Sequence, residues 1–389
     1  MKIFNYYILS EFFLCFLIIW GNILAKTEFI SFCFSLTFII LFSMWFVSIY
    51  QTRKINSLLI LLIVFALMNV TINAGYTLLT LVSIPEYIKK IIMMISTMLS
   101  FYILMLYKPN KIIRNYVAWM PMLMGISLII SYYFLGNTDS MAQAITLGFS
   151  NPNFTAMWLI HLFLYGAYNT FSTKKILIKI FCLIYCLLII QLLFLTMARA
   201  CIGGFFAFIL LVIWGFIKRS YKLSPIVLWA ILLFPLAFML IYMGATNYLT
   251  YTNTFDMVVS EGKSITSRVG VWTDALTSFK QAWWTGNYAG VSYGTGTSQM
   301  LNIHLDILAS YGVLPFILFL GLLWQIVRYF NKQLSSFSNY LAFVSFLTII
   351  LTGTFEAGLV AGCMGLNFLT SGFLVLSNSE TRIISGEER

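Results

Sequence analysis

The chain has 389 residues, of which 61% are hydrophobic and only 9% are charged, and its mean hydropathy is +0.92. A soluble domain normally carries roughly 25% charged residues, so this composition excludes a water-soluble fold. The net charge of +11 would suggest a nucleic-acid partner in a soluble protein. Here the basic residues separate apolar segments, which favours a role in membrane topology and no nucleic-acid partner.

Apolar runs close to the ~20 residues that cross a bilayer recur along the whole sequence. They predict an all-α, polytopic integral membrane protein of about twelve transmembrane helices, with a single membrane domain over residues 1–389. The first run continues to Ala25 without a small-residue cleavage site, so we expect a retained helix. The expected spans are 8–25, 29–49, 56–80, 91–107, 116–135, 154–171, 180–197, 200–217, 225–243, 310–328, 339–355 and 360–377.

The basic residues also predict the orientation. With a cytoplasmic N-terminus, 16 of the 23 Lys and Arg residues fall inside and the other seven outside, as the positive-inside rule requires. Both termini are then cytoplasmic. The loop from Gly136 to Asn153 and the long polar stretch from about Gly244 to Asn302 fall outside. We expect a multi-pass protein of the cytoplasmic (inner) membrane whose active face is periplasmic or extracellular, with one large extracytoplasmic loop over 244–304.

The loop before the sixth predicted span reads LGFSNPNF over residues 147–154. Pro152 forces Asn151 into an extended conformation, and Asn153 is placed to cap the following helix. The two side-chain amides are also suitable partners for sugar hydroxyl groups. Capping and substrate binding therefore both remain open for Asn151 and Asn153. His161, about two turns deeper, is expected to be a core histidine with satisfied hydrogen bonds.

Arg199 lies in the segment TMARACIGG, residues 196–204, between two apolar helices that leave room only for a tight break. The arginine is thereby held at the outer membrane face, where it either binds an anion or anchors the interface by snorkelling. Gly203 and Gly204 open the next helix, and such small residues usually serve close helix packing.

The long polar stretch contains an amphipathic helix, which is expected to lie on the outer leaflet. Ser267 is its candidate N-cap, so Arg268 lies in the first turn, where a cation is unfavourable to the helix dipole. Trp272 offers a ring that would stack on a sugar, with interface anchoring as the alternative. Its apolar and aromatic residues recur at helical spacing: Val269, Trp272, Leu276, Phe279 and Trp283.

The polar stretch turns into the tenth predicted span at Asn302, His304 and Asp306. Asn302 is a candidate substrate-binding residue. His304 and Asp306 are candidate general bases, with capping or packing as the alternative. Glu356, before the final span, is a third candidate base or an arginine partner. The six cysteines lie in or beside apolar runs without paired spacing, which predicts neither a disulfide nor a metal site. No carboxylate pair has metal-binding spacing, so we expect metal-independent chemistry without a cofactor.

Taken together, these residues suit a lipid diphosphate sugar donor. Arginine side chains such as Arg199 and Arg268 bind phosphate oxygens in bidentate fashion and stabilise the charge that grows on the diphosphate as the sugar leaves. A neighbouring base activates the acceptor hydroxyl.

At these residues the sequence resembles the O-antigen polymerase and O-antigen ligase superfamily, the Wzy-like proteins that act on undecaprenyl-diphosphate glycans. Residues 148–153 resemble the family's Gly-Phe-x-Asn-Pro-Asn loop. Residues 198–200 resemble its Ser-Arg-Gly/Ala helix break, with Ala198 in place of serine. Ser267 and Arg268 with Trp272 resemble the start of its loop helix, and residues 284–286 resemble its short glycine turn. The resemblance covers most of the chain.

The resemblance implies a fold similar to the membrane-embedded (GT-C-like) glycosyltransferases. It also implies an undecaprenyl-diphosphate-linked glycan donor and acceptor, contact with membrane lipid, and a chain-length regulator and a flippase as protein partners. In ligases of this family, two such arginines hold the diphosphate and a His-Asn pair, followed by a glycine, supplies the activating histidine. Here Asn302 and Gly312 fit, but Leu301 occupies the histidine position. That departure favours a polymerase, whose pattern at this position looks looser.

We therefore expect polymerisation of lipid-linked repeat units into O-antigen, capsule or exopolysaccharide at the outer face of the membrane. The alternative enzyme is a ligase that transfers finished glycan to lipid A core. A polysaccharide flippase is a third hypothesis from a different class. It is less favoured because a flippase should carry charged residues inside a central cavity, whereas this chain has them in loops at the outer face.

Overall fold

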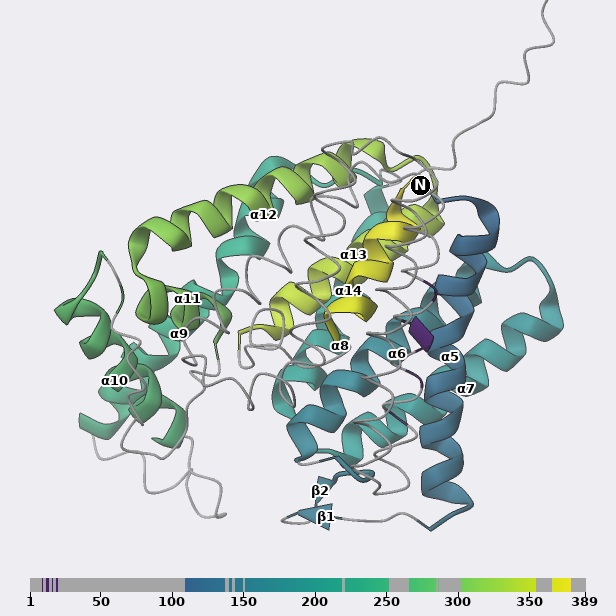
Figure 1. Ribbon diagram of the computed structural model, residues 1–389, viewed down its shortest axis with the longest axis horizontal. Coiled ribbons are helices and arrows are strands. Elements are labelled where there is room, and N and C mark those ends of the chain that lie inside the picture. The colour runs from purple at the N-terminus through teal and green to yellow at the C-terminus, as the bar shows by residue number, and fades with distance from the viewer. Residues whose placement is uncertain are drawn as a thin grey trace, which may run out of the picture.

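The computed structural model describes residues 109–136, 140–141, 144–149, 151–218, 221–251, 266–284, 286, 302–354 and 366–378, together with five residues between Leu9 and Ile19. This part of the chain is almost entirely helical (Figure 1), which confirms an all-α membrane protein. Five of its helices are long and apolar enough to cross a membrane. They are α5 (Lys111–Tyr133), α7 (Ile176–Leu195), α8 (Arg199–Lys218), α9 (Pro225–Tyr251) and α12 (Val313–Gln333).

Three further helices pack among these five: α6 (Pro152–Ser172), α13 (Phe337–Thr352) and α14 (Leu366–Ser377). The 16 residues of α13 rise by about 24 Å, less than the ~30 Å hydrocarbon core of a bilayer. α6 is buried along most of its length and forms the centre of the bundle. The first four predicted spans lie outside the described residues, apart from the five helical residues near the N-terminus.

Three predictions need correction: two helix boundaries and the absence of strands. α9 continues to Tyr251, so the polar loop expected from Gly244 begins as helix. The tenth predicted span, 310–328, corresponds to α12, but its first residues belong to a separate short helix, α11 (Ile303–Tyr311), and Gly312 separates the two. The loop before α6 contains a hairpin of β1 (Ser140–Met141) antiparallel to β2 (Ala144–Ile145), which the all-α prediction did not include. A pair of two-residue strands is too short to show in hydrophobic periodicity.

The helix connections define two ends of the bundle. Where α6 and α8 end and α13 begins, the ring of Phe337 lies 5.6 Å from that of Phe171 and 4.5 Å from that of Phe216. At the same end Asn331 of α12 exchanges two hydrogen bonds with the backbone of Leu223, just before α9. We call this the lysine end, because it carries Lys174, Lys175, Lys218, Lys222 and Lys332.

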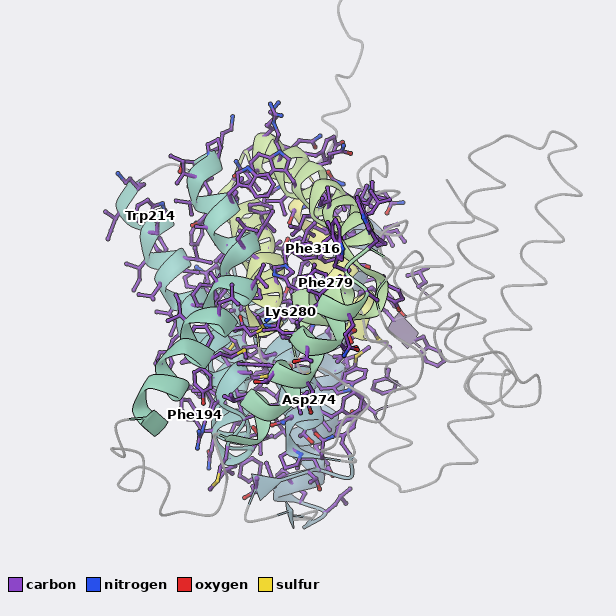
Figure 2. All side chains as sticks on the ribbon, turned by 90° about the vertical axis from the view of Figure 1, so that its left-hand side faces the viewer. Phe194, Trp214, Asp274, Phe279, Lys280 and Phe316 are labelled. Carbon is purple, nitrogen blue, oxygen red and sulfur yellow. The ribbon has the colours of Figure 1, made fainter. Side chains whose placement is uncertain are left out.

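The opposite end, where α8 begins at Arg199, is the arginine end. Figure 2 shows the separation of the two ends, with Phe194 at the end of α7 and Trp214 near the end of α8. α6 also begins at the arginine end, since it terminates at the lysine end. The five lysines of the lysine end and Arg199 thus lie at opposite ends, in the pattern that the charge distribution predicts; the sidedness of the membrane remains a prediction.

Glycines let helices approach closely in the bundle. Tyr340 of α13 lies against Gly215 of α8 and its hydroxyl donates a 2.5 Å hydrogen bond to the Leu211 carbonyl. Tyr185 of α7 lies against Gly166 of α6 in the same way. Small residues at such contacts are typical of helix packing in membranes, where van der Waals contact is a main driving force.

The predicted packing role of Gly203 and Gly204 holds for only one of them. Gly204 is buried, and a methyl group there would overlap the side chain of Thr352 on α13. Gly203 is exposed, and no atom of the described residues lies within 4 Å of the place where its methyl group would be. Gly203 and Gly204 are neighbours on one helix turn, so alanine substitutions at these two positions serve as a test and its control.

We expect Gly204→Ala to lower the thermal stability of the detergent-solubilised protein, because overpacking a tight contact costs typically ~1–3 kcal/mol. Gly203→Ala should leave stability unchanged or raise it by up to ~1 kcal/mol, since alanine has the higher helix propensity. Thermal unfolding of both variants in one detergent measures the difference. Equal melting temperatures would show that α8 does not depend on close contact with α13.

Candidate functional site

Arg199 is the first residue of α8, and its side chain is exposed. Because α7 ends at Leu195, Thr196, Met197 and Ala198 alone join the two helices, which confirms the predicted tight break. The hydroxyl of Thr196 accepts a 3.3 Å hydrogen bond from the backbone N–H of Ala198. This bond closes the turn that presents Arg199 at the end of the bundle.

The start of α8 is suited to bind an anion. Ala198, before the first helical residue, has no side-chain acceptor for the free N–H groups of the first turn. A helix N-terminus carries about half a positive charge, and the guanidinium of Arg199 adds a full charge where a cation is unfavourable. A bound phosphate would relieve this repulsion and accept hydrogen bonds from both groups.

The loop before α6 packs against the helix it precedes. Asn151 is extended, with φ −157° and ψ 160°, as the sequence predicts. Its side chain accepts a 2.8 Å hydrogen bond from the backbone N–H of Phe154, so Asn151 is the N-cap. The predicted cap at Asn153 is wrong, because Asn153 lies inside α6, after Pro152. Binding of sugar by these two amides stays a prediction.

Two non-glycine residues of the described chain have positive φ angles, Leu147 (51°) and Met197 (52°). Each directly precedes a segment that the sequence analysis singled out, residues 148–153 and residues 198–200. A left-handed backbone costs a residue with a side chain about 1–2 kcal/mol. Strain of this kind concentrates at functional sites, and here both instances lie at the arginine end.

The predicted amphipathic helix is confirmed as α10 (Thr266–Gln281). Because the helix already includes Thr266, Ser267 is not its N-cap, although Arg268 does lie in the first turn. The buried face of α10 contacts α9 and α11, and Asp274 and Lys280 lie on its exposed side (Figure 2). The role of Arg268 stays a prediction, as does that of Glu356, which is outside the described residues.

Trp272 is fully buried where α9, α10 and α11 meet. Its ring is edge-on to Tyr242, with 5.8 Å between ring centroids, and it shares an apolar cluster with Met239 and Leu305. The ring therefore offers no exposed face for stacking on a sugar.

Asn302 caps α11 and ties it to two other helices. Its Oδ1 accepts hydrogen bonds from the backbone N–H groups of His304 and Leu305, each at 3.0 Å. Its Nδ2 donates to the carbonyls of Pro235 and Thr354, each at 2.9 Å. Capping and tethering thus account for the whole amide, and substrate binding by Asn302 stays untested.

The end of α13 holds the two candidate segments together. Asn302, at the start of α11, binds the carbonyl of Thr354, and Gly204, in the second turn of α8, packs on Thr352. The helix with the candidate base His304 and the helix with Arg199 therefore converge on the same turn at the arginine end.

His304 is buried with no exposed surface, and neither of its ring nitrogens has a hydrogen-bond partner in the described part of the chain. Its ring lies edge-on to Phe316 and Phe319 of α12, with centroid distances of 5.5 Å and 6.2 Å. Burial lowers the pKa of the imidazole to about 4, so the ring is neutral near pH 7. A neutral imidazole is in the protonation state that a general base requires.

His161 is the other histidine in the sequence, and its environment differs from that of His304. Its Nδ1 lies 2.7 Å from the carbonyl of Met157, and its Nε2 lies 2.9 Å from the hydroxyl of Thr370 on α14. Both nitrogens are therefore satisfied, as predicted for a core histidine. The unpartnered imidazole of His304 is not a general property of the histidines in this fold.

The two candidate bases of α11 do not form a dyad. His304 and Asp306 are both buried, but residues two positions apart on a helix point to different sides. Asp306 lies in the first turn, where a carboxylate is favourable to the helix dipole. Its sequence position thus has a structural explanation that His304 lacks.

The turn after α10 packs on the break between α11 and α12. The backbone N–H of Val313 donates a 2.9 Å hydrogen bond to the carbonyl of Trp283. Gly312 has φ +87°, and a Cβ at this position would overlap the Trp284 carbonyl. Glycine is required for both reasons. The sequence analysis noted Gly312 and the turn at 284–286 separately, and the structure shows that they are contact partners.

No model of a known protein family matches this chain, and no curated protein matches it in sequence. Within the described ranges, no three His, Cys, Asp or Glu side chains are grouped so that they could hold a metal ion. Cys182, Cys186 and Cys201 are buried free thiols.

Proposed function

We propose that this protein polymerises undecaprenyl-diphosphate-linked repeat units into surface polysaccharide by metal-independent glycosyl transfer. In this proposal it has about twelve spans, the architecture of a membrane-embedded glycosyltransferase, and an active face on the outer side of the inner membrane.

Arg199 is the observation that supports the proposal most. It is an exposed arginine at the start of a membrane helix, and the preceding Ala198 has no side-chain acceptor that could cap that helix. A strained residue, Met197, lies two positions before it, and it lies at the end of the bundle opposite the lysine end. An arginine that served only to orient the protein in the membrane would be expected at the same end as the lysines of the lysine end. An arginine kept at the other end suits a ligand with a diphosphate at the membrane surface.

The chemistry assigns one task to each group. Arg199, with Arg268, binds the diphosphate of the donor and stabilises the charge that it gains. An imidazole nitrogen of His304 accepts the proton of the acceptor hydroxyl while that oxygen bonds to the anomeric carbon of the donor. The bond between the anomeric carbon and the diphosphate breaks, and undecaprenyl diphosphate leaves with the electron pair.

Deleting the gene from its host should leave single repeat units, on the lipid carrier or capped onto core, and should remove the ladder of long chains. Gel separation of surface polysaccharide and mass spectrometry of carrier-linked glycans measure this. Complementation with the intact gene is the control. A ligase would give a different result, because its loss would leave full-length polymer on undecaprenyl diphosphate and bare core on lipid A. Long carrier-linked chains in the deletion strain would therefore exclude the polymerase.

A further inference from the structure

We propose that Phe316 and Phe319 of α12 keep water away from His304 and thereby restrict transfer to sugar hydroxyl groups. The inference rests on the proposed function and adds a determinant of acceptor specificity to it. Neither phenylalanine was among the residues predicted from the sequence, where both read as ordinary apolar positions of a membrane span.

The imidazole of His304 is the starting observation. Its two ring nitrogens are buried and have no hydrogen-bond partner among the described residues. Such nitrogens are costly to a fold, because a buried polar group that loses its hydrogen bonds with water and gains none is destabilising. Leucine or phenylalanine would fit this apolar setting better. A histidine in such a place is explained if the ring meets its partner only when a substrate is present.

We call the rings of Phe316 and Phe319 the cover of the His304 imidazole. This cover is thin. Phe316 and Phe319 are buried against His304, while Leu314, Ile317 and Leu318 on the other side of the same turns are exposed by 53%, 58% and 65%. In the described part of the chain, the first turns of α12 therefore lie between the imidazole and the exposed face of that helix.

The segments on both sides of His304 are tied to other parts of the bundle. The head of α11 is tied to α9 and to the end of α13 by both Nδ2 hydrogen bonds of Asn302. The start of α12 is tied to the turn after α10 by the hydrogen bond from Val313 to the Trp283 carbonyl and by the close approach of Gly312 to Trp284. These contacts hold the rings of Phe316 and Phe319 next to the imidazole.

Excluding water matters because water competes with the sugar acceptor. If a water molecule reached the imidazole, the water oxygen would bond to the anomeric carbon and a water proton would pass to His304. The bond from the anomeric carbon to the diphosphate would break, and undecaprenyl diphosphate would leave. The products would be free oligosaccharide and undecaprenyl diphosphate, and the oligosaccharide would be lost from the growing chain. A base enclosed by aromatic rings avoids this side reaction until the acceptor displaces the cover.

Phe316→Ala tests the cover, and Leu318→Ala is its control, since it truncates an exposed apolar side chain of the same turn. Vesicles containing each variant receive lipid-linked repeat units extracted from the deletion strain. Mass spectrometry measures released oligosaccharide against extended chains. We expect the ratio of hydrolysis to transfer to rise by about ten-fold or more in Phe316→Ala, equivalent to one decade in relative rate, and to stay unchanged in Leu318→Ala.

Reaction with diethyl pyrocarbonate gives a second readout that does not need turnover. Modification of His304 should be faster in Phe316→Ala than in the wild type, while modification of His161 should stay slow in both. The milder Phe316→Leu serves if the alanine variant does not fold. Unchanged reactivity of His304 would show that Phe316 is not its cover, and faster reaction without added hydrolysis would show that the cover does not select the acceptor.

The same vesicles separate this inference from the function on which it rests. If the wild-type protein extends no chains from lipid-linked repeat units, the polymerase proposal fails. If the wild-type protein extends chains but Phe316→Ala hydrolyses no more donor than Leu318→Ala, only the cover proposal fails.

Discussion

Arg199→Lys is expected to reduce chain extension by about ten-fold or more, although the positive charge is kept. A lysine ammonium is a point charge without the planar fork that binds two phosphate oxygens at once, and the loss of one charge-assisted contact is worth about 1.5–3 kcal/mol. Arg199→Ala should reduce extension further. Stability should change little in either variant, because the side chain of Arg199 is exposed.

Arg328→Lys is the matched control, since Arg328 is also an exposed arginine on a membrane helix but lies toward the lysine end, on α12. Chain extension by this variant should equal that of the wild type. The measurement is the length distribution of polysaccharide in complemented deletion strains, with membrane levels of each variant determined by immunoblot. A normal ladder in a well-expressed Arg199→Ala strain would remove Arg199 from the site.

His304→Leu is expected to raise the thermal stability of the protein and at the same time to abolish the long-chain ladder. Leucine suits the pocket beside Phe316 and Phe319 and carries no unsatisfied nitrogens, whose burial costs about 1–3 kcal/mol. An isobutyl group cannot accept a proton, and loss of a general base typically slows a reaction by ~10²–10⁴. A residue selected for packing alone would not show higher stability together with lost activity.

His161→Leu should behave in the opposite way. It removes the hydrogen bonds to Met157 and Thr370 but does not alter His304. We expect a lower melting temperature and, in the folded fraction, continued chain extension. Unfolding scans and ladder analysis of both variants form a single experiment. A wild-type ladder from His304→Leu would assign His304 to packing and leave the base to be sought at Asp306 or Glu356.

The local features of this protein follow from its sequence. Continuous apolar runs predict α5, α7, α8, α9 and α12, because a membrane helix must satisfy its backbone hydrogen bonds within itself. The break at residues 196–198 and the extended Asn151 depend on neighbours in the chain, so they too are predicted. The misplaced cap at Asn153 and the missing break at Gly312 are errors of a few residues, where several polar or small side chains compete for one boundary.

The tertiary structure alone decided what each candidate residue contacts. The pattern around Trp272 indicates an amphipathic helix but not that α9 and α11 cover the ring. Likewise, Asn302 and Gly312 match the family's spacing, while their partners Thr354 and Trp284 are distant in sequence. The same applies to His304, whose apolar environment and proposed role depend on Phe316 and Phe319. Periodicity tells which face of a helix is apolar, but hydrogen bonding and exclusion of water depend on contacts between segments, which no local pattern contains.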